Sequence, residues 1–428
     1  MLQPANIFKA NWKILDTGPD KNLNSAYFTA LGLFIGAICG AVISIFRACK
    51  VVAYNFVLYW TAKNETSLIM MACWLLAALF AAQIVGWLIR NPAIMSGGAP
   101  WIGSALENGQ KHPWLKILLP KFLGSWLVLA FGISVGSEGP CVQMGAATAL
   151  GLKKFDVKDL AERRFFILAG CAAGLAGAFS APFAGLCYVY EIMNAKISRS
   201  LLIFLLSGSL GVYFTCNWIF GFGVIVSLQD SAMPSSWGIL LLFPLGVIAG
   251  LIGCAYNYLL RVSIHTYHHL KHLPLFWQPA LPFAVSAILV VLMPSLTGEG
   301  MDIFHRIHEE HLLPGFLCLF VVLKLLFTAF CYGSGIPAGM MVPILCLGGV
   351  TGLLFGDLTT FLGYSYHGWS SSCVAMGMAG AFAAAERAPI TGLVLVLEIT
   401  GAVGIVPGIF LAAAIGSFCA RVCKITAL

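Results

Sequence analysis

Charged residues are scarce in this chain. Asp, Glu, Lys and Arg make up 10% of its 428 residues, against roughly 25% in soluble globular domains. Hydrophobic residues make up 60%, and the mean hydropathy is +0.91. So few charged side chains cannot cover a soluble globule of this size. The composition therefore excludes soluble folds and predicts an all-α polytopic membrane protein.

Motifs that would indicate nucleotide hydrolysis, potassium conduction or redox chemistry are also missing. Neither a Walker loop nor a TVGYG filter occurs, which weakens ATPase and potassium-channel interpretations. The 14 cysteines form no CxxC pair and lie in apolar stretches, where they are typical small core residues. In a membrane protein the net charge of +7 does not indicate nucleic-acid binding. We expect neither enzymatic activity nor a cofactor.

Two groups of histidines bear on the alternative of an intramembrane metalloenzyme. The first group shares one helical face, next to polar neighbours that favour a solvated helix end, and consists of His265, His268, His269 and His272. The second group lacks the HExxH spacing, which favours a loop, and consists of His305, His308 and His311. We expect no metal site at either group.

The chain contains an internal repeat. Residues 181–192 match residues 388–399 at an offset of 207, with seven of twelve positions identical. Upstream of each copy, residues 136–140 and 339–343 share the pattern of a glycine, three residues and a proline. Repeats of this kind occur in secondary transporters, with the binding site at the repeat interface. The chain is therefore expected to consist of two related halves, and the repeat leaves open whether they are inverted.

The predicted organisation follows from the repeat and the apolar runs. A cytoplasmic N-terminal segment covers residues 1–25, because no uninterrupted apolar run begins before about residue 26. The first membrane half covers 26–220 and the second covers 237–428, and a linker at 221–236 joins them.

One stretch of the first half is too short for two membrane spans. Basic residues gather at 153–164 and again at Lys196 and Arg199, so both flanks look cytoplasmic. About 30 residues lie between them, with a break at Ser180 to Pro182, whereas two spans need roughly 40. This predicts short helices that enter the membrane and return.

The segments rich in glycine and proline predict an anion site. In each G-x-x-x-P segment the proline stands near a first helical turn, where the backbone amides have no intrahelical partner. These N–H groups and the positive end of the helix dipole attract anions. Residues 96–100 and 333–337 have a similar composition. We expect several helix starts to converge on one dehydrated anion, without a full positive charge nearby.

Glu138 lies inside one of these segments. At a helix start its carboxylate is able to occupy the place of the anion. The alternative is a carboxylate that only stabilises the helix dipole, but ionisable residues at membrane depth are usually functional. We expect a gate that opens when protonation weakens the hold of Glu138 on the amides.

Other charged residues in apolar runs have less definite roles. Glu191 and Glu398 occupy matching positions of the repeat, and a polar cap and a transport role remain open for them. For the adjacent Glu386 and Arg387 an ion pair or a helix-end anchor is favoured over transport. Lys324 is able to snorkel toward the membrane surface, and its role stays open.

These segments resemble the CLC family of chloride channels and chloride/proton antiporters. The resemblance covers about residues 26–420 and rests on SGGAP at 96–100, GSEGP at 136–140 and GMMVP at 339–343. AGLAGAFSAPFAG at 173–185 and ERAPITGLVLVLEIT at 386–400 are similar to family segments too.

The resemblance implies a CLC-type fold and a set of site residues. The fold has inverted repeats with many tilted, broken and re-entrant helices, in a homodimer whose subunits each hold a pore. Glu138 matches the external gating glutamate and would also accept the proton. The anion-binding residues implied are Ser96, Gly97, Gly98, Gly136, Ser137, Glu138, Gly139, Gly339, Met340, Met341 and Val342.

The sequence departs from the family pattern at three places. The serine that helps to bind the central anion aligns with Gly97, one residue from Ser96. The internal proton glutamate aligns with Ile192, so Glu191 is the possible proton path. The pore tyrosine expected near the C-terminus has no counterpart at 421–428.

The expected function is anion transport, as chloride/proton antiport. Alternatives are a passive chloride channel or an uncoupled anion carrier, and, with less support, a fluoride exporter. Chloride and protons are the transported ions, and the partners are the lipid bilayer and a second copy of the chain. The resemblance implies the prokaryotic type without CBS domains, located in the plasma (inner) membrane.

Overall fold

The computed structural model describes residues 25–64, 67–107, 113–152, 160–228, 231–234, 238–270, 274–304, 313–364 and 366–425. The predicted N-terminal segment 1–25 lies almost wholly outside these residues, as do His272, His305, His308, His311 and most of the basic stretch 153–164. Parts of the predicted linker 221–236 are outside them as well.

The regular elements of the described residues are all helices. The first half contains α1 (Ser25–Asn64), α2 (Leu68–Leu88), η2 (Pro92–Ile94), α3 (Ala99–Glu107), α4 (Leu115–Ala130), α5 (Glu138–Gly151), α6 (Leu160–Phe179), α7 (Pro182–Glu191), α8 (Arg199–Phe214) and η3 (Thr215–Ile219). The second half contains α9 (Gly238–His269), α10 (Ala280–Leu292), η4 (Pro294–Leu296), α12 (Pro314–Gly333), α13 (Met341–Phe361), α14 (Trp369–Glu386), α15 (Pro389–Thr400), η5 (Val403–Ile405) and α16 (Val406–Val422). Seven helical segments within the described ranges are long and apolar enough to cross a membrane.

The helix break predicted for the first half is present, and the second half contains an equivalent one. Helix α6 ends at Phe179 and α7 starts at Pro182, after Ser180 takes a left-handed φ of 55°. Helix α14 ends at Glu386 and α15 starts at Pro389, after Arg387 takes a φ of 56°. Proline favours the first position of a helix, and the left-handed residue reverses the chain before it. The predicted break at Ser180 to Pro182 is confirmed by this arrangement, and the entry of these helices into the membrane and their return stay a prediction.

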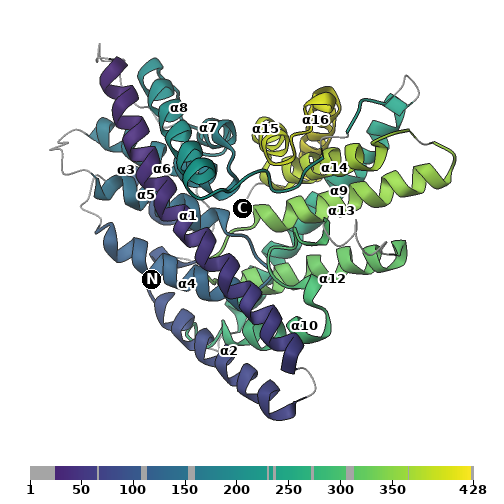
Figure 1. Cartoon of the computed structure of the whole chain (residues 1–428), viewed down its shortest axis with the longest axis horizontal. Coiled ribbons are helices and arrows are strands. Elements are labelled where there is room, and N and C mark those ends of the chain that lie inside the picture. The colour runs from purple at the N-terminus through teal and green to yellow at the C-terminus, as the bar shows by residue number, and fades with distance from the viewer. Residues whose placement is uncertain are drawn as a thin grey trace.

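The two halves pack against each other with equivalent elements in contact. Figure 1 shows α3, α5, α6 and α8 on one side of the molecule and α9, α13, α14 and α16 on the other, with α7 and α15 adjacent between them. At the centre, Gly136 and Gly339 exchange backbone hydrogen bonds of 2.9 and 2.7 Å as an antiparallel bridge. The equivalent glycines of the two repeats thus pair in opposite directions, which is the arrangement of an inverted repeat. The exact bounds of the halves stay a prediction.

Two buried lysines extend this symmetry. Lys121 Nζ donates to the carbonyls of Ile94, at 3.0 Å, and Ser96. Lys324 Nζ donates to the carbonyls of Leu296, at 2.9 Å, and Gly298, at 2.7 Å. Both lysines are fully buried. The role of Lys324 was left open by the sequence; the structure shows that it does not snorkel, because its amine closes a turn inside the protein.

Candidate functional site

A small cavity lies where the repeat motifs meet. Its volume is about 100 Å³. The residues that line it and that the sequence had indicated as anion-binding are Ser96, Gly97, Gly98, Glu138, Gly139, Gly339, Met340 and Met341. The remaining lining residues come mainly from α3, α5, α7, α12 and α14. Segments separated by more than 200 residues in the sequence therefore build one site.

Three helices begin at this cavity. Helix α3 starts at Ala99, α5 at Glu138 and α13 at Met341, and all three residues line the cavity. The first amides of a helix have no intrahelical acceptor, and the helix dipole adds positive potential at the same end. The cavity thus has the electrostatic character predicted for it, because three helix starts converge there. Whether the individual residues bind an anion remains a prediction.

The carboxylate of Glu138 occupies this positive region. Glu138 is 1% exposed, and its Oε1 accepts a hydrogen bond of 2.5 Å from the backbone N–H of Met341. Its Oε2 is buried without a hydrogen-bond partner. A carboxylate oxygen on the first amide of α13 stands where an anion would bind. Glu138 therefore has the geometry of a gate in its closed position.

Two glycines make room for this carboxylate. A Cβ on Gly136 would lie 2.0 Å from Glu138 Oε2, and a Cβ on Gly339 would lie 2.1 Å from Glu138 Oε1. Both distances are far below van der Waals contact. Any larger residue at either position would push the Glu138 side chain out of its place.

Three predicted anion-binding residues do not line the cavity. Gly136 forms the bridge to Gly339, and Val342 is buried in the first turn of α13. The backbone N–H of Ser137 donates to Glu299 Oε1 at 3.0 Å. The Ser137 amide is thus already occupied by an acceptor, which the sequence analysis did not foresee.

Glu299 belongs to a second cavity next to the start of α5. This cavity, of about 140 Å³, is lined by Lys50, Tyr54, Glu299 and Asp302 among others. Lys50 Nζ lies 2.7 Å from Glu299 Oε2 in an ion pair. Burial raises the pKa of Glu299, but Lys50 and the hydrogen bonds from Ser137 outweigh it, so the pKa lies below its ordinary value. A charged pair therefore stands beside the amide that leads into α5.

A basic side chain also lies next to the main cavity. Lys121 donates to the carbonyl of Ser96, and Ser96 lines the cavity. Lys121 itself does not line the cavity, so the expectation of an anion site without a full positive charge nearby stays a prediction. Lys121 lies in an apolar run, and the sequence analysis did not single it out. The packing of α4 against residues 94–96 brings its amine to the carbonyl of Ser96.

Glu191 and Glu398 cap each other's helices. Glu191 Oε1 accepts from Ile390 N at 3.1 Å, and its Oε2 accepts from Thr391 N at 2.7 Å and Thr391 Oγ1 at 2.8 Å. Glu398 accepts from Phe183 N at 3.0 Å and from Ala184 N at 2.7 Å. Each carboxylate thus closes the N-terminus of the helix that bears the other. These contacts favour the polar cap between the two interpretations, and the proton role of Glu191 stays a prediction.

Glu386 lines the main cavity, which the sequence analysis had not favoured. It ends α14, as a helix-end anchor would, but it is buried and lines the cavity, while Arg387 is exposed. Ion-pair geometry between the two is not seen among the described contacts. The burial of Glu386 would have indicated a role at the cavity, but hydrophobic periodicity does not predict burial at a helix end.

Two tyrosines also reach the cavity from apolar helices. Tyr188 on α7 and Tyr332 on α12 line it together with Ile192. The sequence analysis found no counterpart near the C-terminus of the pore tyrosine in the family pattern, and it overlooked both of these residues. A tyrosine in an apolar helix needs a partner for its hydroxyl, and this requirement is the signal that would have pointed to them.

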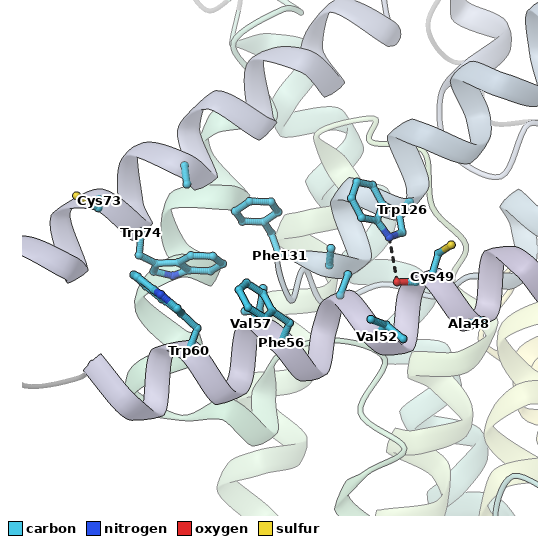
Figure 2. A pocket seen from close by; sticks show the side chains of 13 residues that line it. Ala48, Cys49, Val52, Phe56, Val57, Trp60, Cys73, Trp74, Trp126 and Phe131 are labelled. Atoms are coloured by element: carbon cyan, nitrogen blue, oxygen red, sulfur yellow. Dashed lines mark hydrogen bonds between the residues drawn. The ribbon is translucent and has the colours of Figure 1, made fainter.

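A larger cavity among the described residues lies elsewhere in the molecule. It has a volume of about 890 Å³ and lies between α1, α2 and α4, lined by Trp60, Trp74, Trp126 and Phe131 among others (Figure 2). The indole N–H of Trp126 donates to the Cys49 carbonyl at 3.0 Å, and that of Trp74 to the Ala287 carbonyl at 3.2 Å. This groove is apolar and its indole donors are occupied, so it suits hydrocarbon and not an anion.

The histidines of α9 lie at its exposed C-terminal end. His265, His268 and His269 are exposed, and the imidazoles of His265 and His269 lie 2.9 Å apart. The predicted exposed helix end is confirmed for these three. Groups of three or more metal-ligating side chains were not found among the residues that the structure describes.

Comparison with known proteins gives consistent matches over nearly the whole chain. The family model described as voltage gated chloride channel matches residues 78–421. The H(+)/Cl(-) exchange transporter ClcA of Vibrio vulnificus is 28% identical over 407 residues, which cover 91% of this chain and 86% of that protein.

Two solved structures share the fold. A slow cyanobacterial Cl-/H+ antiporter superimposes with a TM-score of 0.86 at 22% identity, covering 94% of this chain and 96% of the other. A CLC-type fluoride/proton antiporter superimposes with a TM-score of 0.75 at 21% identity, with the same coverage. The inverted arrangement of α-helices described above is thus the fold of these proteins.

Proposed function

Because the chain belongs to the voltage gated chloride channel family, we propose that it exchanges chloride for protons across a membrane, with Glu138 as gate and proton acceptor. The observation that carries this proposal is the carboxylate of Glu138 on the amide of Met341, inside a small cavity where three helices begin.

The gate works by competition for the same amides. Ionised Glu138 accepts the N–H of Met341 and keeps a chloride ion from that position. When Glu138 takes a proton, it loses its negative charge and most of its strength as an acceptor, so chloride binds in its place. A hydrogen bond to a charged group contributes roughly 1.5–3 kcal/mol, which an incoming anion replaces with equivalent bonds. The free-energy difference between the state with Glu138 on the amides and the state with the anion on them therefore stays small.

The cavity favours a small, dehydrated anion. Its volume of about 100 Å³ leaves no room for a full hydration shell, because each water takes roughly 30 Å³. Backbone amides, helix dipoles and Lys121 would supply the replacement for water. We propose Ser96, Gly97, Gly98, Gly139 and Met340 to Val342 as parts of the anion path, with Gly136 and Ser137 at its entrance.

We propose a homodimer in the plasma (inner) membrane of a prokaryote, in which each subunit has its own path. Helices α7, α8, α15 and α16 expose large apolar side chains such as Tyr190, Leu210, Phe410 and Phe418. In a membrane these side chains face lipid or a second copy, and the family resemblance favours the second copy.

Passive anion conduction is the second candidate, and one observation favours it. Ile192 lines the cavity where a protonatable residue would be expected, and a hydrocarbon side chain cannot carry a proton. Fluoride transport is tested with the same preparation, by replacing chloride with fluoride.

The test is simultaneous measurement of chloride and proton flux. The purified protein is placed in liposomes with a chloride gradient, and chloride and pH are recorded together. We expect chloride leaving the vesicles to drive protons inward, and Glu138→Gln to abolish the proton flux. Asp357→Asn is the matched control, since Asp357 lies on α13 and does not line the cavity. Chloride flux without proton flux in the wild type would contradict exchange, and absence of anion flux would contradict transport altogether.

A further inference from the structure

Glu386 shares the cavity with Glu138. Both side chains are buried and both line the same volume of about 100 Å³. Glu138 Oε2 and Glu386 Oε1 are each buried without a hydrogen-bond partner. Two glutamates, each with a buried oxygen that has no hydrogen-bond partner, thus line one small cavity, although 248 positions separate them in the sequence.

The position of Glu386 is fixed by its neighbours. Asn257 Nδ2 on α9 donates to the carbonyl of Ala385 at 2.8 Å, and the adjacent Tyr256 hydroxyl donates to the carbonyl of Met340 at 2.8 Å. The last turn of α14 and the start of α13 are therefore held by consecutive residues of one helix. This arrangement keeps Glu386 at the cavity instead of letting it turn away with Arg387.

Three other residues, Ile192, Glu191 and Glu398, are less suited than Glu386 to carry a proton. Ile192 lacks a titratable group. Glu191 accepts three hydrogen bonds from the start of α15, and Glu398 accepts two from the start of α7. Neither of these glutamates lines the cavity. Glu386 is thus the carboxylate, besides Glu138, that the described structure places there.

We propose that Glu386 is the second proton carrier of the exchange cycle, receiving the proton from Glu138 across the cavity and passing it toward the side of Ile192. This inference rests on the proposed exchange function. It assigns the inner half of the proton route to a residue outside the position where the family resemblance had placed it.

The transfer needs no further reactant. The O–H bond of protonated Glu138 breaks, a water molecule or direct contact relays the proton, and an O–H bond forms on the Glu386 carboxylate. The cavity has room for roughly three waters at about 30 Å³ each, and Tyr188 and Tyr332 are among the residues that line it.

The shared cavity also couples the proton to the anion. Two carboxylates that line one small buried cavity resist being ionised together. The other titratable or charged groups around it are Tyr188, Tyr332 and, behind Ser96, Lys121. A chloride ion adds a further negative charge, so its entry favours the state in which a carboxylate holds a proton. Anion binding and proton uptake therefore promote each other.

The test is the ratio of protons to chloride in liposomes for Glu386→Gln. We expect chloride still to cross while the ratio falls at least tenfold, and Glu386→Asp to restore part of it. Asp357→Asn is the matched control, because it neutralises a carboxylate that does not line the cavity, and it should keep the wild-type ratio.

The outcomes separate this inference from the proposed function. A wild type that exchanges protons and a Glu386→Gln variant with the same ratio would overturn the role of Glu386 and leave exchange intact. A wild type without proton flux would overturn both. Infrared difference spectra recorded on adding chloride provide a readout that does not need flux: a protonated-carboxyl band that Glu386→Gln removes supports the proposal, and an unchanged spectrum refutes it.

Discussion

Glu191 caps the start of α15 and Glu398 caps the start of α7, and these caps predict the effect of replacing either glutamate. In Glu191→Ala two backbone amides and one hydroxyl lose their acceptor, and in Glu398→Ala two backbone amides lose theirs. The hydroxyl of Thr391 is able to turn to another acceptor, whereas the amides are fixed by the helix.

The expected magnitude follows from the kind of bond lost. Replacement of an N-terminal cap costs typically about 1 kcal/mol and up to about 2 kcal/mol, and the helix dipole adds roughly 0.3–1 kcal/mol for a partly exposed charge. Both carboxylates are partly exposed, so we expect a loss of about 2 kcal/mol for Glu191→Ala and slightly less for Glu398→Ala. For a chain of 428 residues this lowers Tm by roughly 2 °C.

The assay is thermal unfolding in detergent, followed by tryptophan fluorescence, together with the proton-to-chloride ratio in liposomes. The double variant should lose less than the sum of the single losses, because both caps stabilise the same α7–α15 contact. All three variants should keep the ratio of the wild type. Loss of proton coupling in Glu191→Gln at an unchanged Tm would refute the capping argument and place Glu191 on the proton path.

Three further predictions concern the loops around the cavity. Gly98→Ala should lower the free energy of unfolding by roughly 1–2 kcal/mol, measured by thermal unfolding, because the φ of Gly98 is +80°. In Gly97→Ala the added Cβ would lie 3.6 Å from its nearest neighbour, so this variant should fold normally. Its chloride binding, measured by calorimetry, should be weaker than that of the wild type. Lys121→Met and Lys324→Met should each lower stability by about 2 kcal/mol by leaving buried carbonyls unpaired, but only Lys121→Met should also weaken chloride binding several-fold. The pKa of Glu299 is lowered, so its ion pair with Lys50 stabilises the fold above the ordinary carboxylate pKa, and this stabilisation is lost as pH falls through the lower folded pKa. The Tm difference between wild type and Glu299→Gln should thus be constant from pH 7 to about 5. A difference that vanishes within that interval would contradict the pairing.

The sequence by itself determined the class of the protein and the elements of its gate. Composition excluded a soluble fold, since too few charges are present to solvate one. The repeat of residues 181–192 at 388–399 predicted two related halves, and the glycine and proline segments predicted helix starts. These inferences depend on local chemistry and on spacing along the chain, and both can be read without knowing which segments meet.

The tertiary structure decided which residues share a space. The direction of the repeats became visible only when Gly136 and Gly339 paired antiparallel. Glu191 and Glu386 look alike in the sequence, as acidic residues at helix ends, yet one caps a neighbouring helix and the other faces the cavity. Their surroundings come from segments about 200 or more residues away. Burial and hydrogen bonding set the role of a carboxylate, and here both depend on segments that are distant in the sequence. The roles of Glu191 and Glu386 could therefore not be read from the residues alone.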